Sequence, residues 1–251
     1  MAESPDMPDA ASLARSMRGL LCAGLYSSAS TWMLNLASQI LKAGGYAGVK
    51  TIYLDEMDEA AQRAIAGATF MLAKSHSPGA SVRNLIDRQR LPVIITLRDP
   101  RDAVASMMLR WNVGFDLALD RVRRSAAALA QLADCPAALV FRYEDGFTTD
   151  ERCVDAVAKL LGVTLTPADR AALLTGLAPQ AVRQQIESWR QAGVLGHGPP
   201  DVEYEPETHW HLDHVGDGET GKWRRVLGAI QAVRVLLATR AYRKSFGYSR
   251  W

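Results

Sequence analysis

The chain has 251 residues, of which 48% are hydrophobic and 22% are charged, as in an ordinary globular domain. Its formal net charge of +2 at pH 7 is too close to neutral to indicate a nucleic-acid partner. No apolar run approaches the ~18 residues of a transmembrane helix, so we expect no integral membrane protein. The three cysteines are widely spaced in apolar surroundings, which predicts buried thiols and a cytoplasmic protein.

The first recognisable element is a strand. Residues 1–13 are polar and expected to be loose, and Ala10–Met17 can add a short helix. Arg15 and Arg18 before the apolar run Gly19–Gly24 imitate a signal peptide. A strand is the better interpretation of this run, because cleavage there would remove the strand that leads into the next motif.

A loop rich in hydroxyl groups follows that strand. The apolar run breaks at Ser27–Thr31, and a helical pattern then places Trp32, Leu36 and Ile40 in line. Backbone N–H groups and hydroxyls at a helix N-terminus favour an anion, so this order predicts phosphate or sulfate binding. The loop lacks the glycines and the lysine of a nucleoside-triphosphatase loop. A capping turn that binds nothing is the alternative.

A second motif follows the buried-strand pattern of Leu91–Leu97, which is rich in β-branched residues. Asp99 suits the N-cap of a helix and Pro100 its first position. Arg98 closes the strand and Ser106 lies about two turns into the helix, so both can face the crevice beyond a parallel sheet. An arginine and a hydroxyl form a phosphate clamp. Two surface residues without a ligand are the alternative.

The remaining segments alternate between strands and helices. Strands are expected at Lys50–Leu54, Thr69–Ala73 and Ala138–Arg142, and helices over Asp116–Ala133, over Glu151–Leu161 and after Thr166 and Pro179. This alternation predicts a single α/β domain over residues 1–251, with a parallel sheet of about five strands flanked by helices. Residues 193–221 are rich in Gly, Pro and His without a clear period, which is typical of a long functional loop.

Together these segments resemble the sulfotransferases that use PAPS, 3′-phosphoadenosine 5′-phosphosulfate, as donor. Five elements fall in that family's order between about Gly19 and Arg225. They are the strand–loop–helix ending in Thr31-Trp32, the Lys-x-His element Lys74-Ser75-His76, the pair Arg98 and Ser106 eight positions apart, Tyr143-Glu144-Asp145, and the glycine loop Gly216–Trp223. The resemblance implies a core like that of the P-loop nucleoside triphosphatases, with a phosphosulfate-binding loop.

The resemblance assigns a role to each position. His76 would be the general base, because an unperturbed histidine titrates near pH 6.5, and Lys74 would stabilise the transferring group. The implied donor site consists of Ser27, Ser28, Ala29, Ser30, Thr31, Trp32, Arg98, Ser106, Tyr143, Gly218, Gly221, Lys222 and Trp223. The alternative role of His76 is a hydrogen bond within a turn. The alternative role of Trp32 is packing in the core.

Two positions depart from the family's pattern. Ser27 stands where the family's loop usually carries Lys or Arg, and Gly216-Asp217 where its C-terminal loop usually begins with a basic pair. A donor with about four negative charges then depends on backbone N–H groups and on other cations. These cations are Lys74, Arg98, Lys222, Arg224 and Arg225.

The histidines near the C-terminus allow several interpretations. His209, His211 and His214 with Asp213 resemble a cluster of metal ligands, but no strand pattern aligns them, so we expect no metal. Lining the entrance for the acceptor, or a plain loop, is the preferred interpretation. Arg240–Trp251 mixes cations with aromatic residues, and we expect a packed last helix rather than a membrane contact.

The expected function is transfer of a sulfuryl group from PAPS to a hydroxyl or amine, with release of adenosine 3′,5′-bisphosphate (PAP). The expected acceptor is a small molecule, a lipid or a glycan, and assembly into a homo-oligomer is left open. One alternative is a non-catalytic protein that binds the bisphosphate nucleotide, an interpretation kept open by Ser27 in place of a cation. A nucleotide-dependent phosphotransferase is less well supported, because it would need a lysine in the loop.

Overall fold

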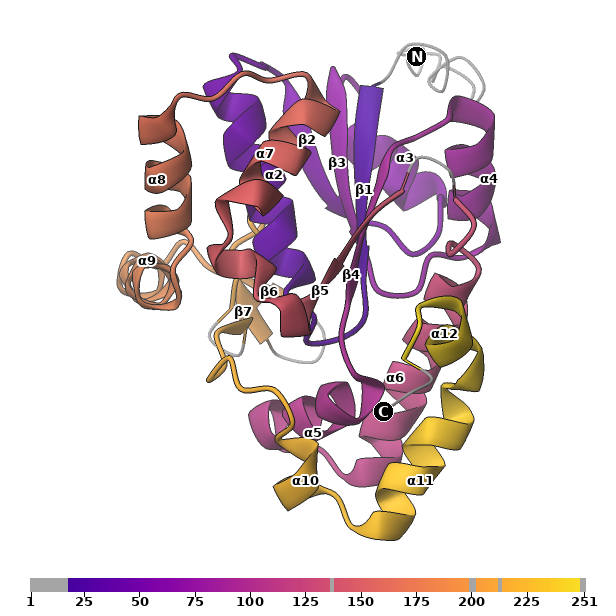
Figure 1. Cartoon of the computed structure of the whole chain (residues 1–251). Helices are drawn as coiled ribbons and strands as arrows, with labels where there is room; N and C mark the ends of the chain where they lie inside the picture. Colours follow the sequence, from indigo (N-terminus) through magenta and orange to yellow (C-terminus); the bar gives the residue numbers. More distant parts are fainter. Residues whose placement is uncertain (1–17, 136–137, 199–201, 212–213, 249–251) are drawn as a thin grey trace, which may run out of the picture.

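The computed structural model describes residues 18–135, 138–198, 202–211 and 214–248. Its centre is a five-stranded parallel sheet with the order β2-β3-β1-β4-β5 (Figure 1). The strands are β1 (Arg18–Gly24), β2 (Val49–Tyr53), β3 (Phe70–Ser75), β4 (Val93–Leu97) and β5 (Ala138–Arg142). The predicted α/β fold with about five parallel strands is confirmed. The expectations for residues 1–13 and 10–17 lie outside the described residues.

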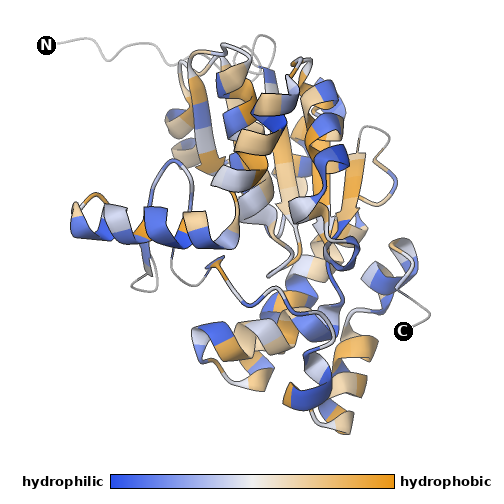
Figure 2. Ribbon diagram, turned by 60° about the vertical axis from the view of Figure 1, so that its left-hand side comes forward, coloured by the Kyte–Doolittle hydropathy of each residue, from blue (hydrophilic) through white to orange (hydrophobic). Residues whose placement is uncertain are grey.

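Both faces of the sheet are covered, and its strands are therefore largely apolar (Figure 2). Successive side chains of a strand point to opposite faces. In β1, Leu20 and Cys22 belong to one hydrophobic cluster, whereas Leu21 and Ala23 belong to the other. The sheet thus separates two cores.

Each core is closed by its own group of helices. One includes residues of α2 (Ser30–Ala43), α7 (Glu151–Leu161), α8 (Pro167–Gly176) and α9 (Pro179–Gln191). The other includes residues of α3 (Glu59–Ile65), α4 (Ala80–Gln89), α5 (Pro100–Trp111), α6 (Phe115–Ala130), α11 (Ala229–Ala238) and α12 (Arg240–Ser245). Figure 1 shows α5, α11 and the short α10 (Trp223–Val226) beyond the lower end of the sheet, where the strands end.

Local sequence signals set several helix ends as predicted. Asp99 caps α5, and Pro100 is its first residue. Gly162 ends α7 in the left-handed conformation, with φ 69°. Thr166 and Asp169 form a capping box at the start of α8.

The segment 193–221 contains more regular structure than its sequence predicts. Strand β6 (Gly196–Gly198) pairs antiparallel with β7 (Val202–Tyr204). Strands of three residues are too short for an alternating pattern to mark them. Further along, Trp210 is buried in the same cluster as α2, so the described part of this segment packs against the rest of the chain.

The C-terminal helix α12 packs inward, as the preferred interpretation of residues 240–251 predicted. Tyr242 is fully buried, and its hydroxyl donates to the carbonyl of Arg98 and accepts from the Arg98 N–H, each at 3.1 Å. Within the described ranges, every helix is too short or too polar to span a lipid bilayer.

The strand register brings several strand ends to one edge of the sheet. Gly24 at the end of β1 pairs with Thr96 of β4, and Leu97 pairs with Arg142 at the end of β5. The segments that follow these strands therefore meet at this edge, where open α/β sheets bind ligands.

Candidate functional site

A cavity of about 540 Å³ opens at this edge of the sheet. The predicted site residues that line it are Ser27, Ala29, Ser30, Thr31, Trp32, His76, Arg98, Ser106, Tyr143, Gly218 and Lys222. The predicted residues that do not line it are Ser28, Lys74, Gly221 and Trp223. The fold thus gathers residues from four strand ends and from the C-terminal glycine loop.

The loop between β1 and α2 has a strained backbone. Ser27 and Ala29 adopt the left-handed conformation, with φ of 60° and 64°, which costs a residue with a Cβ roughly 1–2 kcal/mol. Such strain persists where the surrounding structure enforces it, often at binding loops. Ala29 is the N-cap of α2 and offers no side-chain hydrogen bond. The first N–H groups of the helix are therefore available to an anion.

Ser28 braces this loop from inside and does not face the cavity. It is fully buried, and its Oγ donates to the carbonyl of Leu25 at 2.7 Å and lies 2.8 Å from Thr96 Oγ1. Gly24 makes the close packing of the turn feasible, because a Cβ there would lie 2.7 Å from that of Ser30. The structure therefore supports a role for Ser28 in loop shape in place of the predicted contact with a ligand.

His76 is held in one orientation and one tautomer. Its Nδ1 lies 2.6 Å from the carbonyl oxygen of Gly24, and because a carbonyl only accepts, the proton is on Nδ1. The ring stacks on Tyr26 with centroids 4.2 Å apart. Burial, reinforced by the positive charge of Lys74, lowers the pKa of His76 to about 3. The imidazole is therefore neutral near pH 7, and Nε2 is the ring atom that can accept a proton.

The turn that carries His76 is anchored by Asp55, which lies just after β2. Its Oδ1 accepts hydrogen bonds from Ser75 Oγ at 2.5 Å and from the N–H groups of His76 and Ser77 at 3.2 and 3.0 Å. One carboxylate thereby fixes the backbone on both sides of the histidine.

Lys74 is buried behind the cavity. Its Nζ lies 5.7 Å from the centre of the Tyr53 ring, and burial lowers its pKa to about 8. The adjacent charge of Asp55 opposes this shift, whereas Arg110 adds to it. Lys74 does not line the cavity, but its positive charge contributes to the lowered pKa of His76.

Four histidines in this region, of which His76 is buried and the other three are partly buried, predict a stability that depends on pH. Burial lowers the pKa of His76 and His211 to about 3 and that of His209 to about 4, and holds the pKa of His214 well below 6.5. Between pH 6.5 and about 4 the unfolded chain binds protons that the folded chain does not, so stability falls as the pH falls. Each such histidine contributes a slope of about 1.4 kcal/mol per pH unit.

Denaturant unfolding at pH 7 and at pH 5 measures this dependence. We expect a lower free energy of unfolding at pH 5, and a shallower dependence in His211→Gln, which removes one titrating group. Equal stability at the two pH values would contradict the assignment of these histidines as neutral in the folded protein.

Arg98 joins the two loops of the site. Its Nη1 donates to the carbonyl of Ser27 at 2.8 Å, and its Nη2 donates to the carbonyl of Glu219 at 2.7 Å. The guanidinium lies over the ring of Tyr143, 4.2 Å from its centre. Its Nε is buried and has no hydrogen-bond partner in the described part of the chain. The Nε–H group is thus left without a protein acceptor among the described residues.

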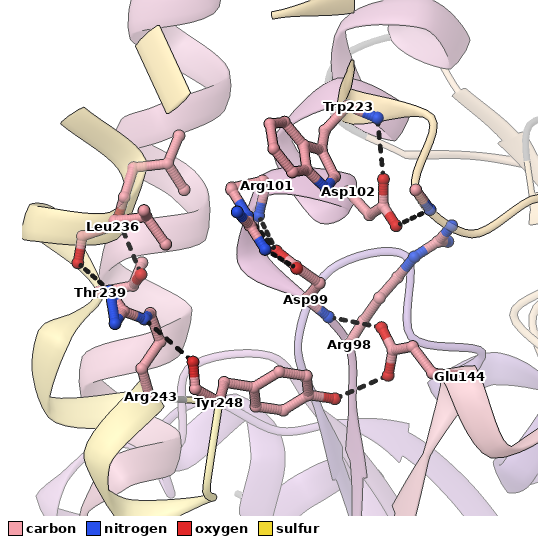
Figure 3. Close-up of polar contacts among 12 residues, drawn as sticks. Arg98, Asp99, Arg101, Asp102, Glu144, Trp223, Leu236, Thr239, Arg243 and Tyr248 are labelled. Atoms are coloured by element: carbon pink, nitrogen blue, oxygen red, sulfur yellow. Dashed lines mark hydrogen bonds and ion pairs between the residues drawn. The ribbon is translucent and has the colours of Figure 1, made fainter. Parts of the chain in front are cut away.

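Carboxylates organise the backbone behind Arg98 (Figure 3). Asp102 accepts hydrogen bonds from the N–H groups of Gly221 at 2.5 Å and Trp223 at 2.9 Å. Glu144 accepts from the N–H of Asp99 at 2.7 Å and from the hydroxyl of Tyr248 at 2.8 Å. The N–H groups of Gly221 and Trp223 are therefore used within the protein, which differs from their predicted contact with a ligand.

Three basic side chains reach the cavity near the C-terminal glycine loop. Lys222 is buried and forms an ion pair with Asp217. Arg183 donates from Nη2 to the carbonyl of Gly216 at 3.0 Å. Arg110 lies close to the same glycine, because a Cβ on Gly216 would be 3.5 Å from Arg110 Cδ. Arg110 and Arg183 also line the cavity, a role that the analysis of motifs missed. Only the tertiary fold places α5 and α9 beside this loop.

Aromatic side chains also line the cavity. Trp32 is buried, its indole N–H donates to the carbonyl of Leu177 at 3.2 Å, and its ring meets the edge of Phe147 at 5.7 Å. Tyr143 packs on Phe147 in the same way, at 6.5 Å. Trp32 thus belongs to the core and also lines the cavity.

His209, His211 and His214 are the histidines that the sequence suggests as a cluster of metal ligands. Trp210 and His214 line the cavity, as expected of residues at an entrance. Among the described residues, no three His, Cys, Asp or Glu side chains are grouped to hold a metal ion. Asp213, part of the cluster suggested by the sequence, lies outside the described residues.

Comparisons with known proteins were made for both sequence and structure. A scan against protein-family models and a search of curated proteins gave no match. The solved structure of mouse sulfotransferase SULT7A1 complexed with PAP aligns with a TM-score of 0.63 and 11% identity, over 94% of this chain and 87% of that chain. Retinol dehydratase in complex with androsterone and inactive cofactor PAP gives a TM-score of 0.61 and 16% identity, over 95% and 82%.

A second structure of retinol dehydratase, with retinol and PAP, aligns with a TM-score of 0.59 and 17% identity, over 91% of this chain and 82% of that chain. Likeness at such low identity concerns the arrangement of helices and strands. The chain has the α/β fold of sulfotransferase SULT7A1 and of retinol dehydratase, both solved with PAP bound, and the order of its motifs predicted a sulfotransferase fold.

Proposed function

We propose that this protein transfers a sulfuryl group from PAPS to a hydroxyl or amine acceptor and releases PAP. The observation that carries this proposal is the placement of His76. Its hydrogen bond to Gly24 leaves Nε2 as the proton acceptor, and the residue lines the same cavity as the uncapped N-terminus of α2 and Arg98. A base and groups that bind anions thus share one space.

The polar groups of the cavity fit a donor that carries a 3′-phosphate and a 5′-phosphosulfate. The loop 27–31 and the N-terminus of α2 would hold the phosphosulfate. The Nε of Arg98, which lacks a partner among the described residues, and the hydroxyl of Ser106 would hold the 3′-phosphate. Trp32 and Tyr143 would flank the adenine.

The charges around the cavity support an anionic ligand. Among the described residues that line it, Arg98, Arg110, Arg183 and Lys222 are basic, whereas Asp217 is acidic. Since Asp217 pairs with Lys222, the arginines remain to balance a donor with about four negative charges. Arg110 and Arg183 would replace the basic pair that is missing at Gly216-Asp217.

The residues would act by placement and by charge, as in phosphoryl transfer. His76 Nε2 takes the proton of the acceptor group while that group forms a bond to sulfur. The bond between sulfur and the bridging oxygen breaks, and its electron pair stays on PAP. Backbone N–H groups of the loop stabilise the developing charge, and Lys74 adds positive potential from behind.

The acceptor is proposed to be a small molecule, a lipid or a glycan. Retinol dehydratase, which shares this fold, was solved with androsterone and with retinol. Near His76 the cavity is lined by Tyr26 and Trp111, whose rings meet edge to face at 5.9 Å and offer an apolar wall. Free, buried thiols at Cys22 and Cys153 support a location in the cytoplasm.

Incubation with radiolabelled PAPS and a panel of phenols, sterols, amines and sugars tests the proposed function. We expect labelled acceptor and one PAP released for each group transferred. PAP binding without transfer to any acceptor would favour the non-catalytic alternative, which the uncharged Ser27 in the loop supports. Transfer of a phosphoryl group from ATP, without transfer from PAPS, would favour a phosphotransferase.

Ser27→Lys tests the departure at the loop. Ser27 lines the cavity, and a lysine there would place positive charge beside the bond that breaks. A preorganised contact of this kind contributes ~2.7–4 kcal/mol, so we expect turnover to rise if the loop accepts the longer side chain. Turnover and PAP affinity are measured on the same preparation.

Two other outcomes of this substitution are informative. Loss of turnover with unchanged PAP affinity would show that another cation already serves this place. Loss of PAP affinity as well would contradict the placement of Ser27 at the phosphosulfate.

A further inference from the structure

Thr208 and His214 both contact residues of α2. Asn35 of α2 donates from Nδ2 to the carbonyl of Thr208 and to that of Thr31, each at 2.8 Å. His214 Nε2 lies 3.3 Å from Thr31 Oγ1, and both residues line the cavity. A side chain distant in sequence thus reaches the hydroxyl at the centre of the loop that we propose to bind the phosphosulfate.

The contacts of His214 define where its proton is. The N–H of His211 donates to His214 Nδ1 at 3.3 Å, so Nδ1 is an acceptor. The ring is neutral because burial, with the charges of Lys74 and Arg110, holds its pKa well below 6.5. The proton is therefore on Nε2, the atom that faces Thr31.

Neighbouring rings fix this orientation. The centres of the His211 and His214 rings are 3.5 Å apart. The ring of Trp210 meets the His214 ring edge to face, with centres 5.7 Å apart. Little side-chain freedom remains to be lost when Nε2–H meets an anion, so the donor is preorganised.

The loop itself offers no charged side chain in this place. Ser27, Ala29, Ser30 and Thr31 supply hydroxyls and backbone N–H groups only. A rigid N–H donor beside Thr31 has the position to bind the oxygens of a phosphosulfate that these groups hold.

We propose that His214 donates a hydrogen bond from Nε2 to the 5′-phosphosulfate, and so supplies the side-chain donor that the loop lacks at Ser27. This inference rests on the proposed function. It makes His214 a residue that contacts the donor, distinct from His76, which takes the proton of the acceptor.

Calorimetry of His214→Ala with two nucleotides tests this role. PAP carries phosphates at both the 3′ and 5′ positions, whereas adenosine 3′-phosphate lacks the 5′ group. A hydrogen bond to a charged group is worth ~1.5–3 kcal/mol, so we expect the variant to lose roughly 10-fold or more in PAP affinity. Its affinity for adenosine 3′-phosphate should not change.

Two further variants separate this contact from a structural role. His214→Gln keeps an N–H donor and should recover most of the PAP affinity. His209→Asn is the matched control on the same segment, because His209 does not line the cavity and asparagine tolerates its left-handed backbone, φ 56°. We expect this control to bind both nucleotides like the wild type.

Unchanged PAP affinity in His214→Ala would overturn the inference, and so would an equal loss for both nucleotides, which would mean that His214 only shapes the cavity. Failure of the proposed function is a separate result. In that case the wild-type protein itself would bind PAP no more tightly than adenosine 3′-phosphate and would transfer nothing from PAPS.

Discussion

Replacing His76 with alanine is expected to lower turnover by roughly 10²–10⁴-fold while PAP affinity stays nearly the same. The reason is that His76 would meet the acceptor through Nε2, while its contact with this part of the chain is a single hydrogen bond from Nδ1 to Gly24 at the end of β1. The loop is instead braced by Ser28 and Thr96. Steady-state turnover and calorimetry with PAP measure the two quantities.

His76→Gln is the matched variant. Its amide can donate to Gly24 as the imidazole does, but it cannot take up a proton at neutral pH. Both variants should therefore be equally slow. Turnover within a few-fold of wild type in either one would contradict the role of His76 as base.

Replacing Arg98 with alanine is expected to remove much of the preference for PAP over AMP. Arg98 is buried, and its Nε lacks a partner within the described residues. In the proposed site, alanine at this position would delete the charge-assisted contact to the 3′-phosphate. Such a contact to a phosphate contributes ~1.5–3 kcal/mol, or roughly 10–150-fold in affinity. Affinity for AMP, which has no 3′-phosphate, should change much less.

Arg98 also holds the carbonyls of Ser27 and Glu219, so a control for loop shape is needed. Arg98→Lys keeps the charge but loses the planar fork, and we expect an affinity for PAP between those of wild type and Arg98→Ala. Arg234→Ala removes an exposed ion pair with Asp116 and should have no effect. An equal loss of PAP and AMP binding in Arg98→Ala would show that the arginine serves only the loop.

Much of the fold could be predicted because buried parallel strands leave a strong signal. Strand β4 is a run of β-branched and aliphatic residues, and Asp99-Pro100 marks the helix that follows it. Since each motif directly follows a strand, the meeting of His76, Arg98 and Tyr143 at one edge follows from the parallel sheet itself. The resemblance of their order to sulfotransferases is confirmed at the level of the fold.

The contacts of single side chains could not be predicted in the same way. Ser28 is one of several small residues in the loop, and only its packing beside Thr96, 68 positions away, turns it inward. Lys74 has strand spacing with His76, yet it is buried behind the cavity beside Tyr53. Such outcomes depend on packing between distant segments, for which a local pattern carries no signal.

The same holds for groups that the motifs do not contain. Asp102 binds the N–H groups of Gly221 and Trp223 across about 120 positions of sequence. Arg110 is visible as a neighbour of Ser106 on one face of α5, but its place beside Gly216 depends on how the C-terminal loop returns to the sheet. The position of Arg110 in line with Ser106 is the one signal in the sequence that points to this role.

Everything proposed for this chain depends on recognition of a nucleotide with phosphates at both the 3′ and 5′ positions. Calorimetry of the wild-type protein with PAP, AMP and ATP tests this recognition most directly. We expect PAP to bind far more tightly than either AMP or ATP, because Arg98 and Ser106 would hold the 3′-phosphate while the loop 27–31 holds the 5′ group. Equal affinity for PAP and AMP, or a preference for ATP, would contradict the donor site proposed here.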